Sequence, residues 1–382
     1  MTPRERVLAA FRGEATDRIP VYHVGFCSEV ASQLLGREAY VGGGIQQWRE
    51  ARALWEGEDV HQEYLERSFR DARDLALACE MDVIRPSYWR FPRTPTEKVD
   101  EHTYRYTDGP PEGWVVLHFD RASEQTHIAH CNPRGPTTLE DLEAQVMRRE
   151  EQLAAPAGPP RVHEAALRMH RELGNRYLVE VGAAAVGIAL LSDPAWFEAI
   201  ALRPDLVARD LDCQVVAFEH DIAAAVAHGF PVVVAGTDFA STDGPMYSPR
   251  VFDEIVLPRI QRAARIAHEA GVYMVYASDG NLWPVADSLF GASGIDGYME
   301  IDRAAGMDLG ELRLRYPRLT LFGNISSQTV ALGTRDEVVA QTLSCLEQAR
   351  AGGVVAGMSN YFVPGTPMAN VEAVLDTIRE HR

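Results

Sequence analysis

The sequence lacks the features that mark secreted and membrane-spanning proteins. No apolar run approaches the roughly 18 residues that a membrane-spanning helix needs. The opening stretch MTPRERVLAAFRG carries charges among its apolar residues, which predicts an amphipathic helix rather than a signal peptide. The five cysteines are widely spaced and form no CxxC pair, so we expect free thiols in a reducing compartment. We therefore predict a cytoplasmic protein.

Basic residues are also outnumbered, because the chain has 37 lysines and arginines against 55 aspartates and glutamates. The formal net charge is therefore -18. A nucleic acid or an anionic membrane would require a basic surface, so we predict a small-molecule substrate and neither of those partners. The glycine-rich phosphate-binding patterns GxGxxG and GxxxxGK[ST] are absent. Their absence counts against a doubly wound nucleotide-binding sheet.

What the sequence does contain is an alternation of short β-branched runs with longer helical patterns, which is typical of a parallel α/β fold. There are eight such runs, at residues 18–26, 81–87, 177–183, 231–238, 272–279, 296–302, 319–326 and 353–360. Residues 248–271 and 336–353 show the helical spacing of covering helices. Eight βα units predict a (β/α)8 TIM barrel, with the doubly wound open sheet as the alternative.

The second unit is longer than the others, because about 90 residues separate its strand from the next one. Residues 97–131 alternate in the manner of β-strands, and a charged helical pattern follows at 140–153. We therefore predict one barrel domain over residues 1–382, with a β-arm and a helix inserted at 90–160.

In a barrel of this kind the functional residues lie after the carboxyl ends of the strands, and the polar residues there indicate a polar or ionic site. The catalytic candidates are Asp238, Asp279, Glu300 and His23. The substrate-binding candidates are Arg85, Trp89, Glu180, Tyr247, Tyr276, Ser278, Trp283, Asn324, Asn360 and Tyr361.

Five of these candidates also have a structural interpretation. Asp238 and Asp279 occur where an Asx-turn or a helix cap would suit the local sequence. Glu180 and Glu300 lie within apolar strands, where each needs a partner such as Arg85, and an ion pair in the barrel interior would explain them. A single histidine such as His23 is often a hydrogen-bonded core residue rather than an acid, a base or a ligand.

Aromatic residues gather in the same loops and predict a rim suited to an aromatic or cationic molecule, with ordinary loop packing as the alternative. They are Tyr22, Phe26, Tyr88, Trp89, Tyr247, Trp283, Tyr361 and Phe362.

Several segments together resemble the uroporphyrinogen decarboxylase superfamily, whose members are (β/α)8 barrels. They are RERVLAAFRGEATDRIPV (4–21), TDFASTDGPMYSPRVFDEIVLPRI (237–260), SDGN (278–281), GIDGYMEID (294–302), MDLGEL (307–312), LFGNIS (321–326) and GTPMANVEAVL (365–375). The superfamily contains the true decarboxylases and corrinoid-dependent methyltransferases that act on methanol, methylamines, methyl halides or aromatic methyl ethers.

The chain departs from both specialised branches. A true decarboxylase carries an arginine-rich RQAGRY segment after its first strand to hold carboxylates, whereas this chain reads HVGFCSEVASQLLGR with only Arg37. The coenzyme-methylating branch has HxCG after the fifth strand and a cysteine after the eighth, which bind zinc. Here those positions hold Ala277, Asp279 and Asn360, a poor set for Zn²⁺, so we predict no metal site there.

The resemblance therefore implies an enzyme that moves a methyl group from a small methylated substrate to cobalamin on a separate corrinoid protein. No tightly bound cofactor is expected, and the superfamily implies a homodimer. The alternatives are a decarboxylase or lyase of a tetrapyrrole or smaller carboxylic acid, with Arg85 holding a carboxylate, and a ligand-binding barrel without catalysis.

Overall fold

The computed structural model describes the chain except residues 87–88, 108–112, 133–136, 155–161, 189 and 191–192. Each of the eight predicted runs contains a strand or a bridge of a parallel sheet, so the α/β class is confirmed. The strands are β1 Gly25–Phe26, β2 Val83–Ile84, β7 Leu178–Val179, β8 Val232–Gly236, β11 Tyr273–Ala277, β12 Gly297–Met299, β13 Thr320–Phe322 and β14 Val354–Val355. β15, Tyr361–Phe362, extends this sheet by pairing with β1.

The strand pairings run in a circle. β8, β11, β12, β13 and β14 pair in that order, and Val21, just before β1, forms a parallel bridge with Ala356. On the other side β2 pairs with β7, and Gly182 bridges to Val234 of β8. The Asp82 amide donates to the Val21 carbonyl at 2.7 Å and joins the first strand to β2.

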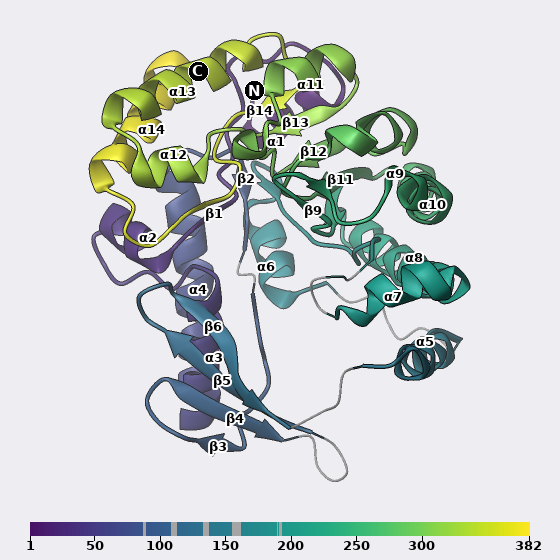
Figure 1. Cartoon of the computed structure of the whole chain (residues 1–382). Helices are drawn as coiled ribbons and strands as arrows, with labels where there is room; N and C mark the ends of the chain where they lie inside the picture. The colour runs from purple at the N-terminus through teal and green to yellow at the C-terminus, as the bar shows by residue number, and fades with distance from the viewer. Residues whose placement is uncertain (87–88, 108–112, 133–136, 155–161, 189, 191–192) are drawn as a thin grey trace.

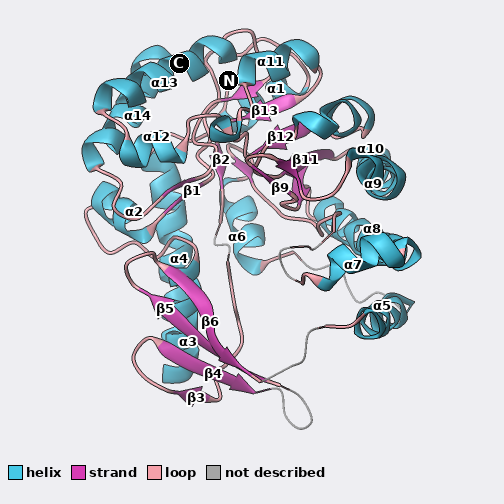
Figure 2. Cartoon of the chain, in the orientation of Figure 1, coloured by secondary structure: helices cyan, strands magenta, loops and turns pink. Residues whose placement is uncertain are grey.

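Helices surround these central strands (Figures 1 and 2). They are α1 Pro3–Phe11, α2 Ser28–Leu35, α3 Gly44–Glu56, α4 Glu58–Ala78, α5 Leu139–Ala154, α6 Glu164–Leu173, α7 Ala195–Leu202, α8 Pro204–Ala227, α9 Pro249–Val251, α10 Leu257–Glu269, α11 Leu309–Arg315, α12 Ser327–Leu332, α13 Arg335–Ala349 and α14 Met368–His381. The predicted helix at 248–271 is interrupted by a π-helical turn, Phe252–Val256, between α9 and α10. In the described part of the chain no helix is both long and apolar enough to cross a membrane.

The core follows from the β-branched runs, because strands of a parallel sheet are covered on both faces. Val233 and Val275 are fully buried, as are the rings of Tyr276 and Tyr298. Helix α1 begins with a capping box between Thr2 and Glu5.

Between β2 and β7 the chain forms an antiparallel sheet of four strands, β3 Glu97–Lys98, β4 Thr103–Thr107, β5 Trp114–Asp120 and β6 Gln125–Cys131. This sheet and α3 project from the central strands at the lower left of Figure 1. Trp48 of α3 stacks on Phe119 with ring centroids 4.7 Å apart. The Glu124 carboxylate, in the β5–β6 turn, accepts from the Ser28 and Glu29 amides at 2.6 and 2.9 Å, so the sheet is tied to the start of α2.

Two further short strands pair with each other near the end of β8. β9 Ala240–Ser241 and β10 Gly244–Pro245 form a small hairpin directly after Asp238. The Asn281 amide donates to the Ser241 carbonyl at 2.8 Å. The hairpin therefore packs against the loop that carries Asp279.

Candidate active site

Three of the four predicted catalytic residues lie together. Asp238, Asp279 and Glu300 follow β8, β11 and β12, which are neighbours in the parallel sheet, so their carboxyl ends meet at one edge. One carboxylate oxygen from each lies within 4.8 Å of the others. We call these residues the carboxylate trio.

Neither aspartate of the trio has the local structural role that the sequence allowed. Asp238 Oδ1 accepts from the Asp279 amide at 3.1 Å, which is a contact between strands rather than an Asx-turn. Asp279 Oδ2 accepts from Asn360 Nδ2 at 2.8 Å, and the turn that follows is made by Asn281, which accepts from the Trp283 amide. Asp279 therefore caps no helix, and its carboxylate remains in the trio.

Two carboxyls of the trio, those of Asp279 and Glu300, have raised pKa values. Burial, Asp238 and Asp302 raise the pKa of Asp279 to about 7, against the opposing hydrogen bond from Asn360. Burial, Asp279 and Asp238 raise the pKa of Glu300 to about 8, while Arg85 acts in the opposite direction. Because like charges this close do not all ionise, a protonated carboxyl is present at pH 7.

Glu300 also has an unusual backbone conformation, with φ of +66°. A residue with a Cβ adopts this left-handed region at a cost, and such positions gather at functional sites. Among the described residues Glu300 forms no ion pair. A buried carboxyl without a direct ion pair favours its neutral form.

Arg85 was one candidate partner for Glu180 or Glu300, and the structure pairs it with Glu180. Arg85 Nε lies 2.9 Å from Glu180 Oε1, and Arg85 Nη1 donates to the Val24 carbonyl at 2.9 Å. The Tyr22 hydroxyl donates to the other Glu180 oxygen. The charge of Arg85 is therefore largely neutralised within the protein.

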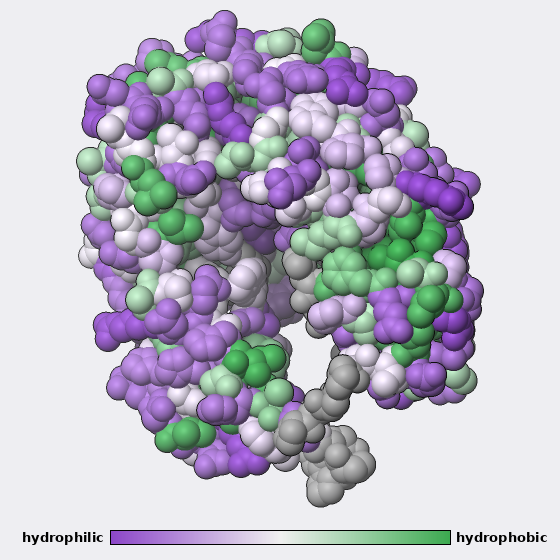
Figure 3. Space-filling model, viewed as in Figure 1, coloured by the Kyte–Doolittle hydropathy of each residue, from purple (hydrophilic) through white to green (hydrophobic). Residues whose placement is uncertain are grey.

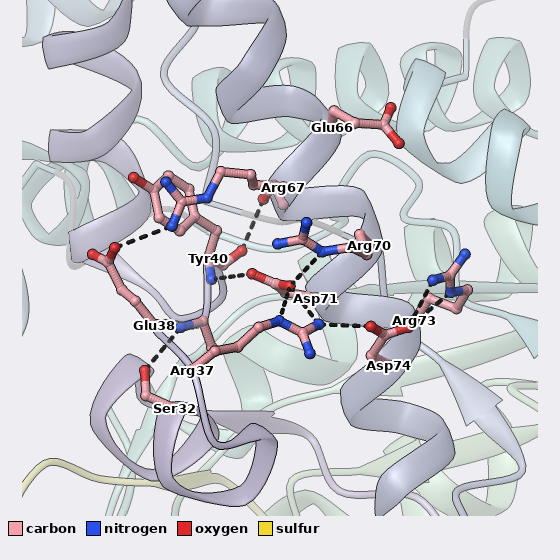
Figure 4. Close-up of polar contacts among 12 residues, drawn as sticks. Ser32, Arg37, Glu38, Tyr40, Glu66, Arg67, Arg70, Asp71, Arg73 and Asp74 are labelled. Carbon is pink, nitrogen blue, oxygen red and sulfur yellow. Dashed lines mark hydrogen bonds and ion pairs between the residues drawn. The ribbon is translucent and has the colours of Figure 1, made fainter.

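Arg37 is also paired, and it lies on the outside of the strand circle. Its guanidinium donates to Asp71 and Asp74 of α4, at 2.8 and 2.6 Å (Figure 4). Asp71 in turn accepts from the Tyr40 amide at 2.9 Å. Arg37 therefore anchors a loop to α4 and is not available to hold a substrate carboxylate.

The surroundings of His23 differ from those of the trio. Its side chain is 1% exposed, and burial lowers its pKa to about 3, so the imidazole is neutral. It is not among the groups that shift the pKa of Asp279 or Glu300. An acid or base role for His23 at neutral pH is therefore not supported by its surroundings.

The predicted aromatic rim is wrong for four of its eight members, which are buried in the core as the alternative of ordinary packing allowed. Tyr22, Phe26, Tyr247 and Phe362 are all under 9% exposed, since loops and neighbouring rings cover them. Trp89 is 46% exposed. Tyr88 lies outside the described residues.

The remaining predicted residues divide into two groups. Ser278, Tyr276 and Asn324 are buried at the strand ends, and Tyr276 donates to the Val186 carbonyl. Asn360, Tyr361 and Trp283 are partly exposed, and Trp283 Nε1 donates to the Gly306 carbonyl.

A cavity of about 320 Å³ lies beside Arg85 and Glu180 and is walled by Trp89, Arg90 and His163 among others. Its volume is in the range of small-molecule sites. Figure 3 shows a hollow with hydrophilic surface near the centre of the viewed face.

The sequence analysis missed two neighbours of the candidate site. Asp302, within the run 296–302, helps to raise the pKa of Asp279, and its spacing of two from Glu300 was a signal for it. Glu50 of α3 is fully buried and accepts from Arg90 Nε at 2.8 Å, so it positions one wall of the cavity. No local pattern identifies Glu50, because its partner is 40 residues away.

The trio also has the donor chemistry of a cation site. Carboxylate oxygens suit hard cations such as Mg²⁺ or Ca²⁺, whereas zinc prefers nitrogen and sulfur. The three positions that carry zinc ligands in the coenzyme-methylating branch hold Ala277, Asp279 and Asn360, of which the last two are joined by a hydrogen bond. These residues do not fit zinc.

Comparisons with known proteins agree with the segments quoted from the sequence. Residues 194–381 match the uroporphyrinogen decarboxylase (URO-D) family model. A uroporphyrinogen decarboxylase from Anaeromyxobacter sp. (strain Fw109-5) is 29% identical over 130 residues, which are 33% of this chain and 35% of that protein. The match thus spans about a third of that relative's length.

Among solved structures, a methyltransferase from Methanosarcina mazei superposes with a TM-score of 0.63 at 20% identity, covering 100% of this chain and 99% of that chain. At this identity the likeness shows a shared fold. This shared fold and the family match over residues 194–381 agree with the resemblance of the quoted segments to the uroporphyrinogen decarboxylase superfamily.

Proposed function

We propose that the protein is a methyltransferase that demethylates a small substrate and passes the methyl group to a corrinoid carried by a separate protein. The observation that carries the proposal is the carboxylate trio, in which Glu300 has a pKa of about 8 and no ion pair among the described residues. We further infer that the circle of paired strands is the (β/α)8 barrel of the superfamily, with residues 97–131 as an arm inserted in it.

The chain's own residues supply acid catalysis in this proposal. Loss of a methyl group from an ether or an amine leaves the electron pair of the broken bond on oxygen or nitrogen. The carboxyl proton of Glu300 transfers to that atom, and Glu300 is left as a carboxylate. Asp279 and Asp238 keep Glu300 protonated before the reaction.

The size of the cavity beside Arg85 and Glu180 supports a corrinoid held by a partner. A cavity of about 320 Å³ accepts a small substrate but is too small to enclose a corrinoid. The corrinoid, when bound beside this cavity, supplies the nucleophile that accepts the methyl group. Trp89 is the exposed aromatic residue beside the cavity and is the residue expected to contact it.

The charge distribution argues against a polycarboxylate substrate. Arg85 and Arg37 are each paired with carboxylates of the chain itself. A carboxylate substrate at the trio would approach three acidic side chains. Decarboxylation of a tetrapyrrole is therefore the less favoured function.

The proposal is tested by anaerobic incubation with reduced cobalamin and a panel of methyl donors, namely methanol, methylamines and methoxybenzenes. We expect at least one donor to produce methylcobalamin, detected by its absorbance spectrum. Glu300→Gln should lower the rate by about 10²–10⁴-fold. Release of carbon dioxide from a porphyrinogen, without methylation of cobalamin by any donor, would show that the chain is a decarboxylase instead.

A further inference from the structure

A cavity of about 530 Å³ lies at the amino ends of the central strands. Its walls include residues 13–19, which lead into the first strand, and residues 349–353, which lead into β14. The carboxylate trio instead follows the carboxyl ends of β8, β11 and β12. Because these strands are parallel, the cavity and the trio lie at opposite edges of the sheet. The cavity is therefore separate from the candidate active site.

Positive charge gathers in the walls of this cavity. The charged residues that line it are four arginines and two acids, namely Arg18, Arg313, Arg350, Arg382, Glu14 and Asp17. The chain as a whole has a formal net charge of -18. A local excess of arginine in so acidic a protein indicates a place for an anion.

The two acids are already paired with cations that do not line the cavity. Glu14 accepts from Arg12 Nε at 2.8 Å. Asp17 accepts from Arg6 Nε at 2.7 Å and from the amino terminus at 3.0 Å. Neither acid is therefore left to neutralise the arginines of the walls.

Arg313 has no carboxylate partner in the described part of the chain. Its Nη1 donates to the Leu319 carbonyl at 2.9 Å. The side chain is half-buried, and burial lowers the pKa of Arg313 without an opposing carboxylate. A cation that is partly removed from water and has no counterion gains by pairing with an anion.

The other two nitrogens of this guanidinium are accessible. Arg313 Nε and Nη2 form no hydrogen bond with any described residue, and neither is sealed from solvent. A Cβ at Gly353 would lie 2.7 Å from Arg313 Cζ and Nη2, so the guanidinium lies directly over this glycine of the wall. The Nε–Nη2 edge presents two parallel N–H groups, which match two oxygens of a phosphate.

Arg18 and Arg350 add charge that is only weakly paired. Arg18 Nη1 and Nη2 lie 3.8 and 3.7 Å from Glu80 and Asp82, beyond hydrogen-bond distance. Arg350 Nε lies 3.1 Å from Glu347, but both side chains are more than half exposed. An exposed pair of this kind is weak, so Arg350 is free to exchange its partner for an anion in the cavity.

We propose that this cavity binds a phosphate group, held by the Nε–Nη2 edge of Arg313 with Arg350 on the opposing wall. A phosphate ion has five heavy atoms and needs roughly 50–75 Å³ at the space one water takes per atom. The cavity of about 530 Å³ therefore also has room for the organic part of a small phosphate monoester. This binding is independent of methyl transfer.

The test is calorimetric titration of the full chain with inorganic phosphate, glycerol 3-phosphate and glycerol, at constant ionic strength. The pH is kept above about 6, where a phosphate monoester is largely a dianion. We expect saturable binding of the phosphates and none of glycerol. Tighter binding of glycerol 3-phosphate would identify an organic phosphate as the ligand, and equal binding would identify free phosphate.

Three variants locate the binding. Arg313→Gln removes the unpaired cation and should weaken phosphate binding about tenfold or more. Arg350→Gln changes an exposed residue and should weaken it about twofold to threefold. Arg335→Gln is the matched control, because it removes the same charge at the far end of α13, roughly 20 Å away along the helix, and should bind as the unaltered protein does. Thermal unfolding confirms that each variant is folded.

Absence of saturable binding by both phosphates would overturn the proposal. So would phosphate binding that folded Arg313→Gln leaves unchanged, or a loss in Arg335→Gln as large as that in Arg313→Gln. If Arg313→Gln does not fold, Arg350→Gln decides the matter, and binding equal to that of Arg335→Gln would then count against the cavity.

Discussion

At the scale of single residues, the carboxyl of Glu300 is defined by what surrounds it. Two other carboxyls raise its pKa, and Arg85 lowers it while being paired with Glu180. The sequence placed Glu300 in an apolar strand and required a partner for it. In the structure the cation, Arg85, pairs with Glu180 instead. The protonated form of Glu300 is therefore favoured over its carboxylate.

This arrangement predicts a dependence of stability on pH. The pKa of Glu300 rises from 4.5 to about 8 on folding, so the folded protein binds more protons between these values. The contribution of Glu300 to the free energy of unfolding is fully present below pH 4.5 and is lost as pH rises through 8. Glu300→Gln should remove this loss, so that between pH 5 and pH 9 the free energy of unfolding falls less in the variant, by at least about 1 kcal/mol.

Urea unfolding at the two pH values measures the difference. Glu198→Gln, on the exposed side of α7, is the matched control and should follow the unaltered protein. A variant of Glu300 whose stability falls as steeply as that of the unaltered protein would contradict the raised pKa.

Arg85 should act on Glu300 through its charge. Arg85→Met removes a cation that lowers the pKa of Glu300, so this pKa should rise further, by roughly half a unit. Titration of ¹³C-labelled glutamate carboxyls by NMR gives the pKa without an activity assay. Arg85→Lys keeps the charge and should leave the pKa near that of the unaltered protein, whereas a loss of packing alone would affect both variants.

At the scale of elements, the antiparallel sheet is joined to the central strands by a helix cap. Glu124 accepts from the first amides of α2, where a carboxylate also meets the positive end of the helix dipole. The sequence predicted the strands of this sheet from their alternation. It carried no signal for the cap, because Glu124 lies 96 residues from Ser28.

Glu124→Ala should therefore loosen α2. We expect a loss of about 1–2 kcal/mol in the free energy of unfolding, which is the usual value of a helix cap. Hydrogen exchange at the Ser28 and Glu29 amides should accelerate with it. Glu97→Ala, an exposed glutamate on β3, is the control and should leave these amides protected.

At the scale of the whole molecule, one buried carboxylate links the first strand of the circle to β2. Asp82 is fully buried, accepts from the Val21 amide at 2.8 Å and pairs with Arg6 of α1. It thus joins α1, the first strand and β2. Arg6 also pairs with the half-exposed Asp17.

Asp82→Leu should destabilise the whole fold by about 3–5 kcal/mol, because it leaves the buried Arg6 without this partner and the Val21 amide without an acceptor. Asp17→Ala changes the exposed partner of the same arginine and should cost about 1 kcal/mol or less. Urea unfolding measures both. Equal losses would show that Asp82 has no special part in joining the strands.

The sequence by itself determined the α/β class and the eight strand positions, because these depend on hydrophobic periodicity, and its quoted segments carry the resemblance to the uroporphyrinogen decarboxylase superfamily. It also identified the three carboxylates, since parallel strands bring their carboxyl ends to one edge. Only the tertiary structure decided which charges are paired, that Arg37 faces α4, that four of the eight predicted rim aromatics are buried and that His23 is buried beside Phe26 and Phe362. Those outcomes depend on contacts between residues far apart in the chain. A pattern of neighbouring residues does not predict such contacts.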